Sequence, residues 1–336
     1  MTMYRSFYGL RERPFDLTSD PRYLCLTANH REALSMLRYG LQSRKGLALL
    51  IGEAGTGKTT LVRAALQEVQ TQHGSVVFLS NPTLTRSEFV EYLAQGFGLG
   101  DRAAGSKTRF LLDLEQLLIE RHQKGALTAL IVDEAQSLSD ELLEEIRLLA
   151  NIETATDKLL AVVLAGQPEL GERLNQGGLR QLKQRIGLRC VLDPLDVAET
   201  AAYIVRRVSV AGGTAQELFS REAVQEIHKQ SGGVPRTISV ICDNVLVSGF
   251  AIREKPVGVR TVQEVCRDFE LLTEEPAYGQ DDASRPDPLE SDLTPTASSA
   301  LPRRNPLRPP GEAAPSGAVP ARHTFSLSGL RERFFS

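Results

Sequence analysis

The sequence of 336 residues contains little cysteine, no strong excess of charge and no long hydrophobic run. Its four cysteines form no CxxC pair and have no matching cluster of histidines; they are Cys25, Cys190, Cys242 and Cys266. This usage argues against a disulfide framework and a zinc site, and it suits a reducing cytosol. The net charge of −3 gives no overall electrostatic reason to expect binding to nucleic acid, although a local basic face stays open.

The longest apolar runs, LALLIG and LLAVVLAG, are far shorter than the roughly 20 residues that a helix needs to span a bilayer. The N-terminal stretch MTMYRSFYGLRERPF carries too many charges for a secretory signal. We therefore expect a cytoplasmic protein that does not insert directly into a membrane. A peripheral position at the inner membrane would require a partner protein.

Short apolar runs alternate with amphipathic helical patterns between residues 46 and 195. This alternation predicts an α/β fold with a parallel sheet of about five strands and flanking helices. Residues 1–45 precede this core as a separate segment. The strand candidates are residues 47–52, 75–80, 128–134, 158–166 and 185–192.

The strand patterns stop after residue 195. Asp196 with Glu199, and Thr261 with Glu264, have the spacing of capping boxes that open helices. The stretches between them have helical patterns only. Residues 196–272 are therefore predicted to form a small all-helical lid domain.

Proline marks a further change of composition, because ten of the 17 prolines lie between residues 276 and 320. Such a segment buries too little apolar surface to offset the entropy of ordering, so 273–324 is predicted to be a disordered linker. The amphipathic segment 325–336 follows, and its GLRERFF echoes the GLRERPF of residues 9–15. Three interpretations stay open: coincidence of two short stretches, a docking motif for some other protein, or a second peptide for the groove that residues 7–15 use.

Residues 52–59, GEAGTGKT, match the full GxxxxGK[ST] pattern of a phosphate loop between a predicted strand and a predicted helix. Its glycines let backbone N–H groups point at phosphate oxygens, and the helix N-terminus adds partial positive charge. Lys58 is expected to reach the β- and γ-phosphates of ATP, and the Thr59 hydroxyl to hold Mg²⁺. The predicted nucleotide-binding residues of the loop are Gly52, Glu53, Ala54, Gly55, Thr56, Gly57, Lys58, Thr59 and Thr60.

An acidic pair, Asp133 and Glu134, ends the buried strand pattern LIVDE, at the edge where α/β sheets hold ligands. We expect Asp133 to hold Mg²⁺ and Glu134 to orient and polarise the attacking water, because phosphoryl transfer needs mainly positioning and charge neutralisation. Gln167 follows the strand LLAVVLAG and is expected between the acidic pair and the γ-phosphate. These residues predict ATP hydrolysis.

Four arginines are candidates for contacts with phosphate. Arg236, in SGGVPR, lies in the first turn of a predicted helix, where a cation is unfavourable unless an anion such as the γ-phosphate is near. Arg180, Arg185 and Arg189 crowd one region, and an arginine finger must be exposed at a protomer edge. Arg185 is the first choice and Arg180 the second; ordinary surface charge is the alternative for each.

These motifs together resemble those of AAA+ ATPases, and more narrowly the ExeA/GspA family of secretion-associated ATPases. The likeness is carried by residues 7–46 and by the blocks LAGQPELGERL, LRQLKQRI and GGVPRTISVICDNVL. The resemblance implies that the N-terminal segment wraps the nucleotide, with Tyr23 to Leu26 and His30 near the adenine and residues 9–15 over the ATPase core. It also implies a homo-oligomer, a ring or a filament, in which Arg185 acts in trans.

Family members that drive secretin assembly carry a transmembrane helix and a peptidoglycan-binding domain after the ATPase, and this sequence shows neither. We predict an ATPase that couples ATP binding and hydrolysis to the assembly or operation of a bacterial envelope secretion or export machine, with an envelope protein as its partner. Two alternatives stay open. One is an ATP-dependent DNA-binding regulator of transposition or replication, and the other is a switch that binds ATP and recruits partners with little turnover.

Overall fold

The structure is a computed structural model that describes residues 3–17, 21–23, 25–43, 45–71, 75–80 and 83–271. The predicted linker 273–324 and the predicted terminal segment 325–336 lie outside the described residues.

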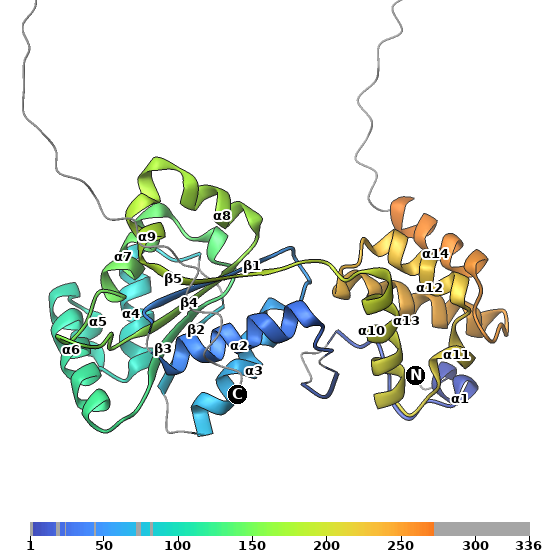
Figure 1. The fold of residues 1–336 in the computed structure, drawn as a ribbon, viewed down its shortest axis with the longest axis horizontal. Helices are drawn as coiled ribbons and strands as arrows, with labels where there is room; N and C mark the ends of the chain where they lie inside the picture. The colour runs from blue at the N-terminus through green and yellow to red at the C-terminus, as the bar shows by residue number, and fades with distance from the viewer. Residues whose placement is uncertain are drawn as a thin grey trace, which may run out of the picture. The chain divides into compact units, whose positions relative to one another are not determined.

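Five parallel strands form one sheet in the order β2-β3-β4-β1-β5 (Figure 1). The five predicted strands and their parallel arrangement are confirmed. Because β4 lies between β1 and β3, the carboxyl ends of these three strands meet at one edge. The bounds are β1 Leu47–Gly52, β2 Ser75–Leu79, β3 Thr128–Val132, β4 Ala161–Gly166 and β5 Ile186–Leu192.

Helices cover both faces of the sheet (Figure 1). Ala48 and Leu50 pack toward α2 (Ala28–Gln42) and α3 (Lys58–Thr71), and Leu49 packs in the core on the other face. Successive residues of a strand point to opposite faces, so a strand covered on both sides needs apolar residues at every position. The other face is covered by α4 Arg86–Phe97, α5 Asp101–Ala104, α6 Lys107–Gln123, α7 Asp140–Leu149, α8 Pro168–Asn175 and α9 Arg180–Arg185, with short 3₁₀ turns η2 Ala135–Ser137 and η3 Gly177–Leu179.

The elements that follow β5 in the described chain are helices, which we call the helical domain. The Asp196 carboxylate accepts a hydrogen bond from the Glu199 N–H at 2.7 Å, so the predicted capping box is present there. The second predicted capping box is wrong: Thr261 lies inside a helix, and its hydroxyl donates to the Glu254 carboxylate at 2.6 Å. The helices are α10 Val197–Val210, α11 Ala215–Leu218, α12 Arg221–Ser231, α13 Pro235–Ala251 and α14 Val259–Leu271.

The N-terminal segment packs into the helical domain. Tyr8, at the end of α1 (Met3–Tyr8), and Leu10 and Phe15 after it are each less than a tenth exposed and belong to the apolar core of that domain. The Phe15 ring meets the Phe219 ring edge-on, with 6.0 Å between centroids. The expectation that residues 9–15 lie over the ATPase core is therefore wrong, because their apolar side chains are buried among α10–α14 instead.

The cysteines are free thiols, and Cys190, Cys242 and Cys266 are buried. Within the described part of the chain, no group of three or more His, Cys, Asp or Glu side chains could hold a metal ion. None of the helices described above is both long and apolar enough to cross a bilayer.

Replacing Phe15 by alanine should lower the free energy of unfolding of the helical domain by about 3–5 kcal/mol, because it leaves a cavity beside Phe219. Urea unfolding followed by circular dichroism measures this change. Leu17→Ala is the matched control: Leu17 is 56 % exposed, so its loss should change the free energy by less than about 0.5 kcal/mol. Equal effects of the two substitutions would show that Phe15 is not part of the core.

Candidate functional site

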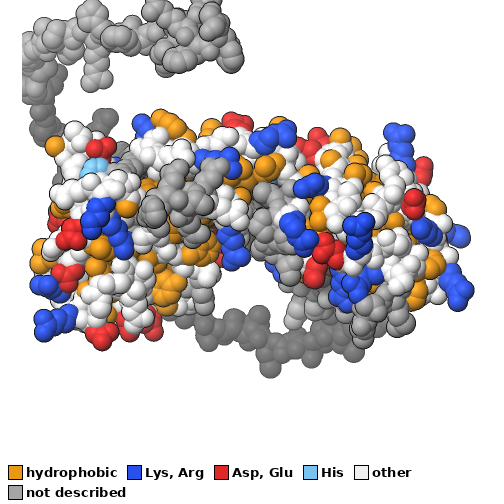
Figure 2. Space-filling model, turned by 90° about the horizontal axis from the view of Figure 1, so that it is seen from below, with side chains coloured by type: hydrophobic (Ala, Val, Ile, Leu, Met, Phe, Trp, Pro, Cys, Tyr) orange, Lys and Arg blue, Asp and Glu red, His pale blue; other side chains and the backbone are white. Residues whose placement is uncertain are grey.

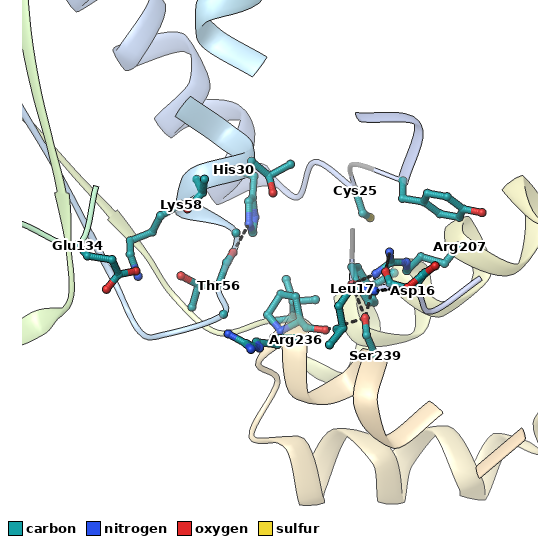
Figure 3. A pocket seen from close by; sticks show the side chains of 18 residues that line it. Asp16, Leu17, Cys25, His30, Thr56, Lys58, Glu134, Arg207, Arg236 and Ser239 are labelled. Carbon is teal, nitrogen blue, oxygen red and sulfur yellow. Dashed lines mark hydrogen bonds between the residues drawn. The ribbon is translucent and has the colours of Figure 1, made fainter. Parts of the chain in front are cut away.

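A pocket of about 370 Å³ opens where the phosphate loop, the N-terminal segment and the helical domain meet (Figure 3). The phosphate loop and α3 supply one wall, and the 3₁₀ turn η1 (Pro21–Tyr23) supplies part of another. Figure 3 shows Lys58 and Glu134 at one end of the pocket and Arg207 with Asp16 at the other. The lining outside the phosphate loop is Asp16, Leu17, Tyr23, Cys25, His30, Thr60, Glu134, Leu195, Tyr203, Arg207, Pro235, Arg236 and Ser239.

The phosphate loop turns around Gly55, whose φ of 85° lies in the left-handed region that favours glycine. A Cβ at this position would lie 2.6 Å from the Cβ of Arg236 and 3.1 Å from a methyl carbon of Val234. The Arg236 N–H also donates to the Gly55 carbonyl at 3.2 Å. The loop therefore touches the first turn of α13, and this contact brings Arg236 to the pocket.

Lys58 is 4 % exposed, and its ammonium donates to the carbonyls of Gly52 at 2.8 Å and Glu53 at 3.0 Å. Burial lowers the pKa of Lys58, and the nearby carboxylates of Glu134 and Asp133 oppose that shift. A buried cation is costly unless it is paired. Phosphate oxygens, which form short and strong hydrogen bonds to an ammonium, are a suitable ligand for it.

Thr59 and Asp133 meet although 74 positions separate them, because β1 and β3 both end at this edge of the sheet. The Thr59 hydroxyl donates to one carboxylate oxygen of Asp133 at 2.5 Å. The other oxygen accepts the Glu134 N–H at 3.1 Å, and Asp133 is 5 % exposed. A hydroxyl beside a carboxylate is the kind of oxygen donor set that Mg²⁺ prefers.

Glu134 is held by two side-chain amides. Its Oε2 accepts hydrogen bonds from Gln136 Nε2 at 2.6 Å and from Gln167 Nε2 at 3.3 Å. Gln136 also accepts the Gln167 N–H at 3.1 Å, so three residues from the ends of β3 and β4 form one network. Glu134 has φ 53° and ψ 38°, a conformation that costs energy in a residue other than glycine and recurs at functional sites.

Gln136 was not singled out in the sequence analysis, although it follows closely after the LIVDE stretch. The sequence feature that could have identified it is its position two residues after Glu134, at the end of a strand. The 3₁₀ turn η2 folds it back so that both amides reach the same carboxylate oxygen.

Arg207 lies at the far end of the pocket from Glu134, and it too was missed (Figure 3). Its guanidinium donates to the hydroxyls of Tyr203 at 2.6 Å and Ser239 at 2.9 Å, and to the Asp16 carbonyl at 3.0 Å. It also stands over the Tyr23 ring, 4.9 Å from the centroid. The sequence signal for Arg207 was its spacing from Tyr203: residues four apart lie on the same face of a helix, and here that face of α10 is buried.

His30 was expected near the adenine, and the structure places it against the phosphate loop. One ring nitrogen lies 3.1 Å from the Thr56 carbonyl oxygen (Figure 3). The other lies 2.9 Å from the Thr27 hydroxyl. His30 therefore braces the backbone of the loop. Tyr23 lines the pocket beneath Arg207.

The three clustered arginines do not line this pocket. Arg180, Arg185 and Arg189 are exposed, and Arg185 ends α9 directly before β5. Ile186 pairs with Leu47, the first residue of β1, so Arg185 lies at the amino edge of the sheet. The six residues of β1, about 20 Å of strand, separate that edge from the phosphate loop.

Comparison with known proteins shows what this part of the chain is similar to. The family described as "AAA domain" matches residues 41–174. The chain is 44 % identical over 250 residues to General secretion pathway protein A of Aeromonas hydrophila, covering 74 % of this chain and 45 % of that protein. It is 28 % identical over 218 residues to the Mu-like prophage FluMu DNA transposition protein B of Haemophilus influenzae, covering 62 % of this chain and 68 % of that protein.

The predicted resemblance to the ExeA/GspA ATPases is therefore confirmed, and the AAA domain implies that the chain binds a nucleotide. The chain spans less than half the length of the secretion protein that it matches. Among solved structures, the ORC2 protein of Aeropyrum pernix matches with a TM-score of 0.57 at 17 % identity, over 79 % of this chain and 75 % of that chain. Cdc6p of Pyrobaculum aerophilum matches with a TM-score of 0.52 at 17 % identity, over 71 % and 65 %. These two likenesses confirm the predicted fold.

Gly55→Ala should weaken nucleotide binding by about tenfold or more, because the new Cβ would meet Arg236 and the backbone φ of 85° would be strained by about 1–2 kcal/mol. Titration with a fluorescent nucleotide measures the dissociation constant. Gly177→Ala is the control, since no heavy atom lies within 4 Å of a Cβ added there. If the AAA domain bound nucleotide equally well in both variants, the phosphate loop would not be the binding site.

Proposed function

We propose that this chain hydrolyses ATP with Mg²⁺, and that it couples the reaction to the assembly or operation of a bacterial envelope secretion or export machine. Hydrolysis rests above all on Glu134, a carboxylate held by two amides beside the Thr59–Asp133 pair. The secretion role rests on the identity to General secretion pathway protein A. An envelope protein would be the partner that brings the chain to the inner membrane.

The phosphate end of the pocket has the positive groups that a triphosphate needs. Lys58 and Arg236 would contact the β- and γ-phosphates, and the N–H groups of the phosphate loop would hold their oxygens. Thr59 and Asp133 would hold Mg²⁺, which when bound neutralises charge on the phosphates. The opposite end, with Tyr23 and Arg207, would take the base and sugar.

Glu134 would hold and polarise the attacking water. Both amide hydrogen bonds go to its Oε2, which leaves Oε1 to accept a hydrogen bond from water. Gln136 and Gln167 would fix the direction of the carboxylate, and positioning of this kind is the main thing that phosphoryl transfer asks of a protein.

A change of the bound nucleotide would be transmitted to the helical domain through two arginines of that domain. Arg236 lies in the first turn of α13 and contacts Gly55, and Arg207 lies on α10. A ligand that contacts both arginines would link the helical domain to the phosphate loop, and loss of the γ-phosphate would remove some of these contacts.

Assembly of several copies would complete the site. Arg185 is exposed at the sheet edge opposite its own phosphate loop, so it would serve the pocket of a neighbouring copy. A ring or a filament of identical copies provides such head-to-tail contacts.

Glu134→Gln should abolish hydrolysis and leave nucleotide affinity within about twofold, because it removes the water-polarising charge but no phosphate contact. Phosphate release and fluorescent-nucleotide titration measure the two properties. Glu141→Gln, an exposed position in the first turn of α7, is the charge-matched control and should hydrolyse ATP normally. Continued hydrolysis by the Glu134 variant would assign the catalytic role to another residue.

Mixing two inactive variants tests the role of Arg185 in trans. Arg185→Ala and Glu134→Gln should each be inactive alone, whereas mixed assemblies should regain about a quarter of the wild-type rate, since one site in four then pairs an intact Glu134 with an intact neighbouring arginine. The same mixture made with Arg189→Ala, which should itself be active, is the control. Failure of the first mixture to regain activity would remove Arg185 as the finger.

A second candidate function is ATP-dependent binding to DNA, which is favoured by the match to the transposition protein. On the face shown in Figure 2, Lys and Arg side chains lie together with Asp and Glu side chains, and Lys and Arg gather on its right-hand part. The net charge of −3 of the whole chain counts against DNA binding.

Filter binding of duplex DNA, with and without ATP at about 150 mM salt, separates the two functions. Under the secretion proposal, retention should stay at the background level that a protein of this charge gives. Tight retention that depends on ATP would overturn the secretion role in favour of the DNA role, whatever the hydrolysis assays show.

A further inference from the structure

The sequence repeats one of its own docking segments. Residues 326–335, SLSGLRERFF, are identical to residues 6–15, SFYGLRERPF, at seven of ten positions. Five of the seven form the unbroken run GLRER. The structure shows what the N-terminal copy binds, and these contacts indicate what the second copy can bind.

The first part of the N-terminal copy docks on the turn between α10 and α11. Gly9, with φ 72°, ends α1 and turns the chain. Leu10 is 7 % exposed, and one of its methyl carbons lies 2.6 Å from where a Cβ on Gly213 would stand. The Arg11 N–H donates to the Ala211 carbonyl at 2.8 Å. The turn therefore has no side chain at Gly213, and leucine occupies that space.

The second part of the copy docks beside the end of α11. Phe15 is 1 % exposed and meets the Phe219 ring edge-on. Glu12 accepts two hydrogen bonds of 3.2 Å from the Arg22 guanidinium. We call the surface formed by Ala211, Gly212, Gly213 and Phe219 the α11 surface.

The second copy retains the residues that make these contacts. Gly9, Leu10, Arg11, Glu12 and Phe15 correspond to Gly329, Leu330, Arg331, Glu332 and Phe335. The differences fall elsewhere. Phe7 corresponds to Leu327 and Pro14 to Phe334. Tyr8, which is buried and donates to the Glu254 carbonyl at 3.2 Å, corresponds to Ser328.

We propose that residues 326–335 are a second, reversible ligand of the α11 surface, in competition with residues 6–15. The shared residues supply the contacts to that surface, and the missing tyrosine makes the second copy the weaker ligand. A weaker competitor tethered to the same chain, or present on a neighbouring copy, gains occupancy from its high effective concentration.

Occupation by the second copy opens the nucleotide pocket. Residues 6–15 lead directly into Asp16 and Leu17, which line the pocket, and the Asp16 carbonyl accepts a hydrogen bond from Arg207. Displacing Leu10 and Phe15 therefore removes one wall of the pocket. The second copy acts as an inhibitory arm, and this consequence rests on the nucleotide site proposed above.

Photo-cross-linking in the full-length chain tests the docking itself. Phe335 is replaced by p-benzoyl-phenylalanine, which keeps an aromatic ring at the position that corresponds to Phe15. Illumination should join it to residues 208–219, in the same chain or in a second copy, and mass spectrometry of the digest locates the link. No link to residues 208–219, or links only to other parts of the protein, would overturn the proposal.

Two substitutions in that cross-linking chain separate specific docking from random contact. Leu330→Asp puts a charge where the α11 surface takes a leucine, and it should reduce the yield of the link by at least about tenfold. Arg333→Ala is the matched control, because Arg13, its counterpart, is exposed, and the yield should stay the same. Equal yields from both variants would also overturn the proposal.

Nucleotide affinity tests the inhibitory consequence. The full-length chain with Leu330→Asp and Phe335→Asp should bind a fluorescent nucleotide up to about twofold more tightly than wild type, because the weaker second copy occupies the surface in fewer than half of the chains and its loss restores the pocket in that fraction. Arg333→Ala should bind like wild type. A specific cross-link without a change in affinity would overturn the inhibitory role and leave the nucleotide site itself intact; absence of nucleotide binding in every variant would instead reject that site.

Discussion

The parallel arrangement of the five strands is the constraint on which the rest of the described structure depends. All carboxyl ends lie at one edge, and the order places β4 between β1 and β3. The phosphate loop, Asp133 and Gln167 follow these three strands, so the sheet brings together residues that are far apart in the sequence. The same arrangement requires helices on both faces, which is why strands such as β1 are apolar at every position.

A buried cation, Arg207, joins three segments of the chain around the pocket. Arg207 on α10 bonds to Ser239 on α13 and to the Asp16 carbonyl in the N-terminal segment. Its Nε has no hydrogen-bond partner among the described residues. Hydrogen bonds to a charged group contribute about 1.5–3 kcal/mol each, and they offset the cost of burying the guanidinium. The N-terminal segment thus packs into the helical domain and also lines the pocket.

Much of the fold and the phosphate end of the site could be predicted, because their signals are local in the sequence. Apolar runs predict the strands, and a strand, a glycine-rich loop and a helix in succession predict Lys58 and Thr59. The errors came from pairings across the chain. Thr261 and Glu264 have the spacing of a capping box, but the helix already begins at Val259. Local patterns also cannot tell which apolar core receives Leu10 and Phe15, or that Arg207 reaches Asp16, because these contacts join positions about 190 residues apart.

The length of β1 has a consequence for how turnover responds to protein concentration. Arg185 and the phosphate loop stand at opposite ends of this strand, so a single copy cannot supply both to one ATP. Under the proposed arrangement in trans, the specific activity of the chain rises with its own concentration. Dilution alone then switches hydrolysis off, and ATP is spent only where copies have been gathered at a common place.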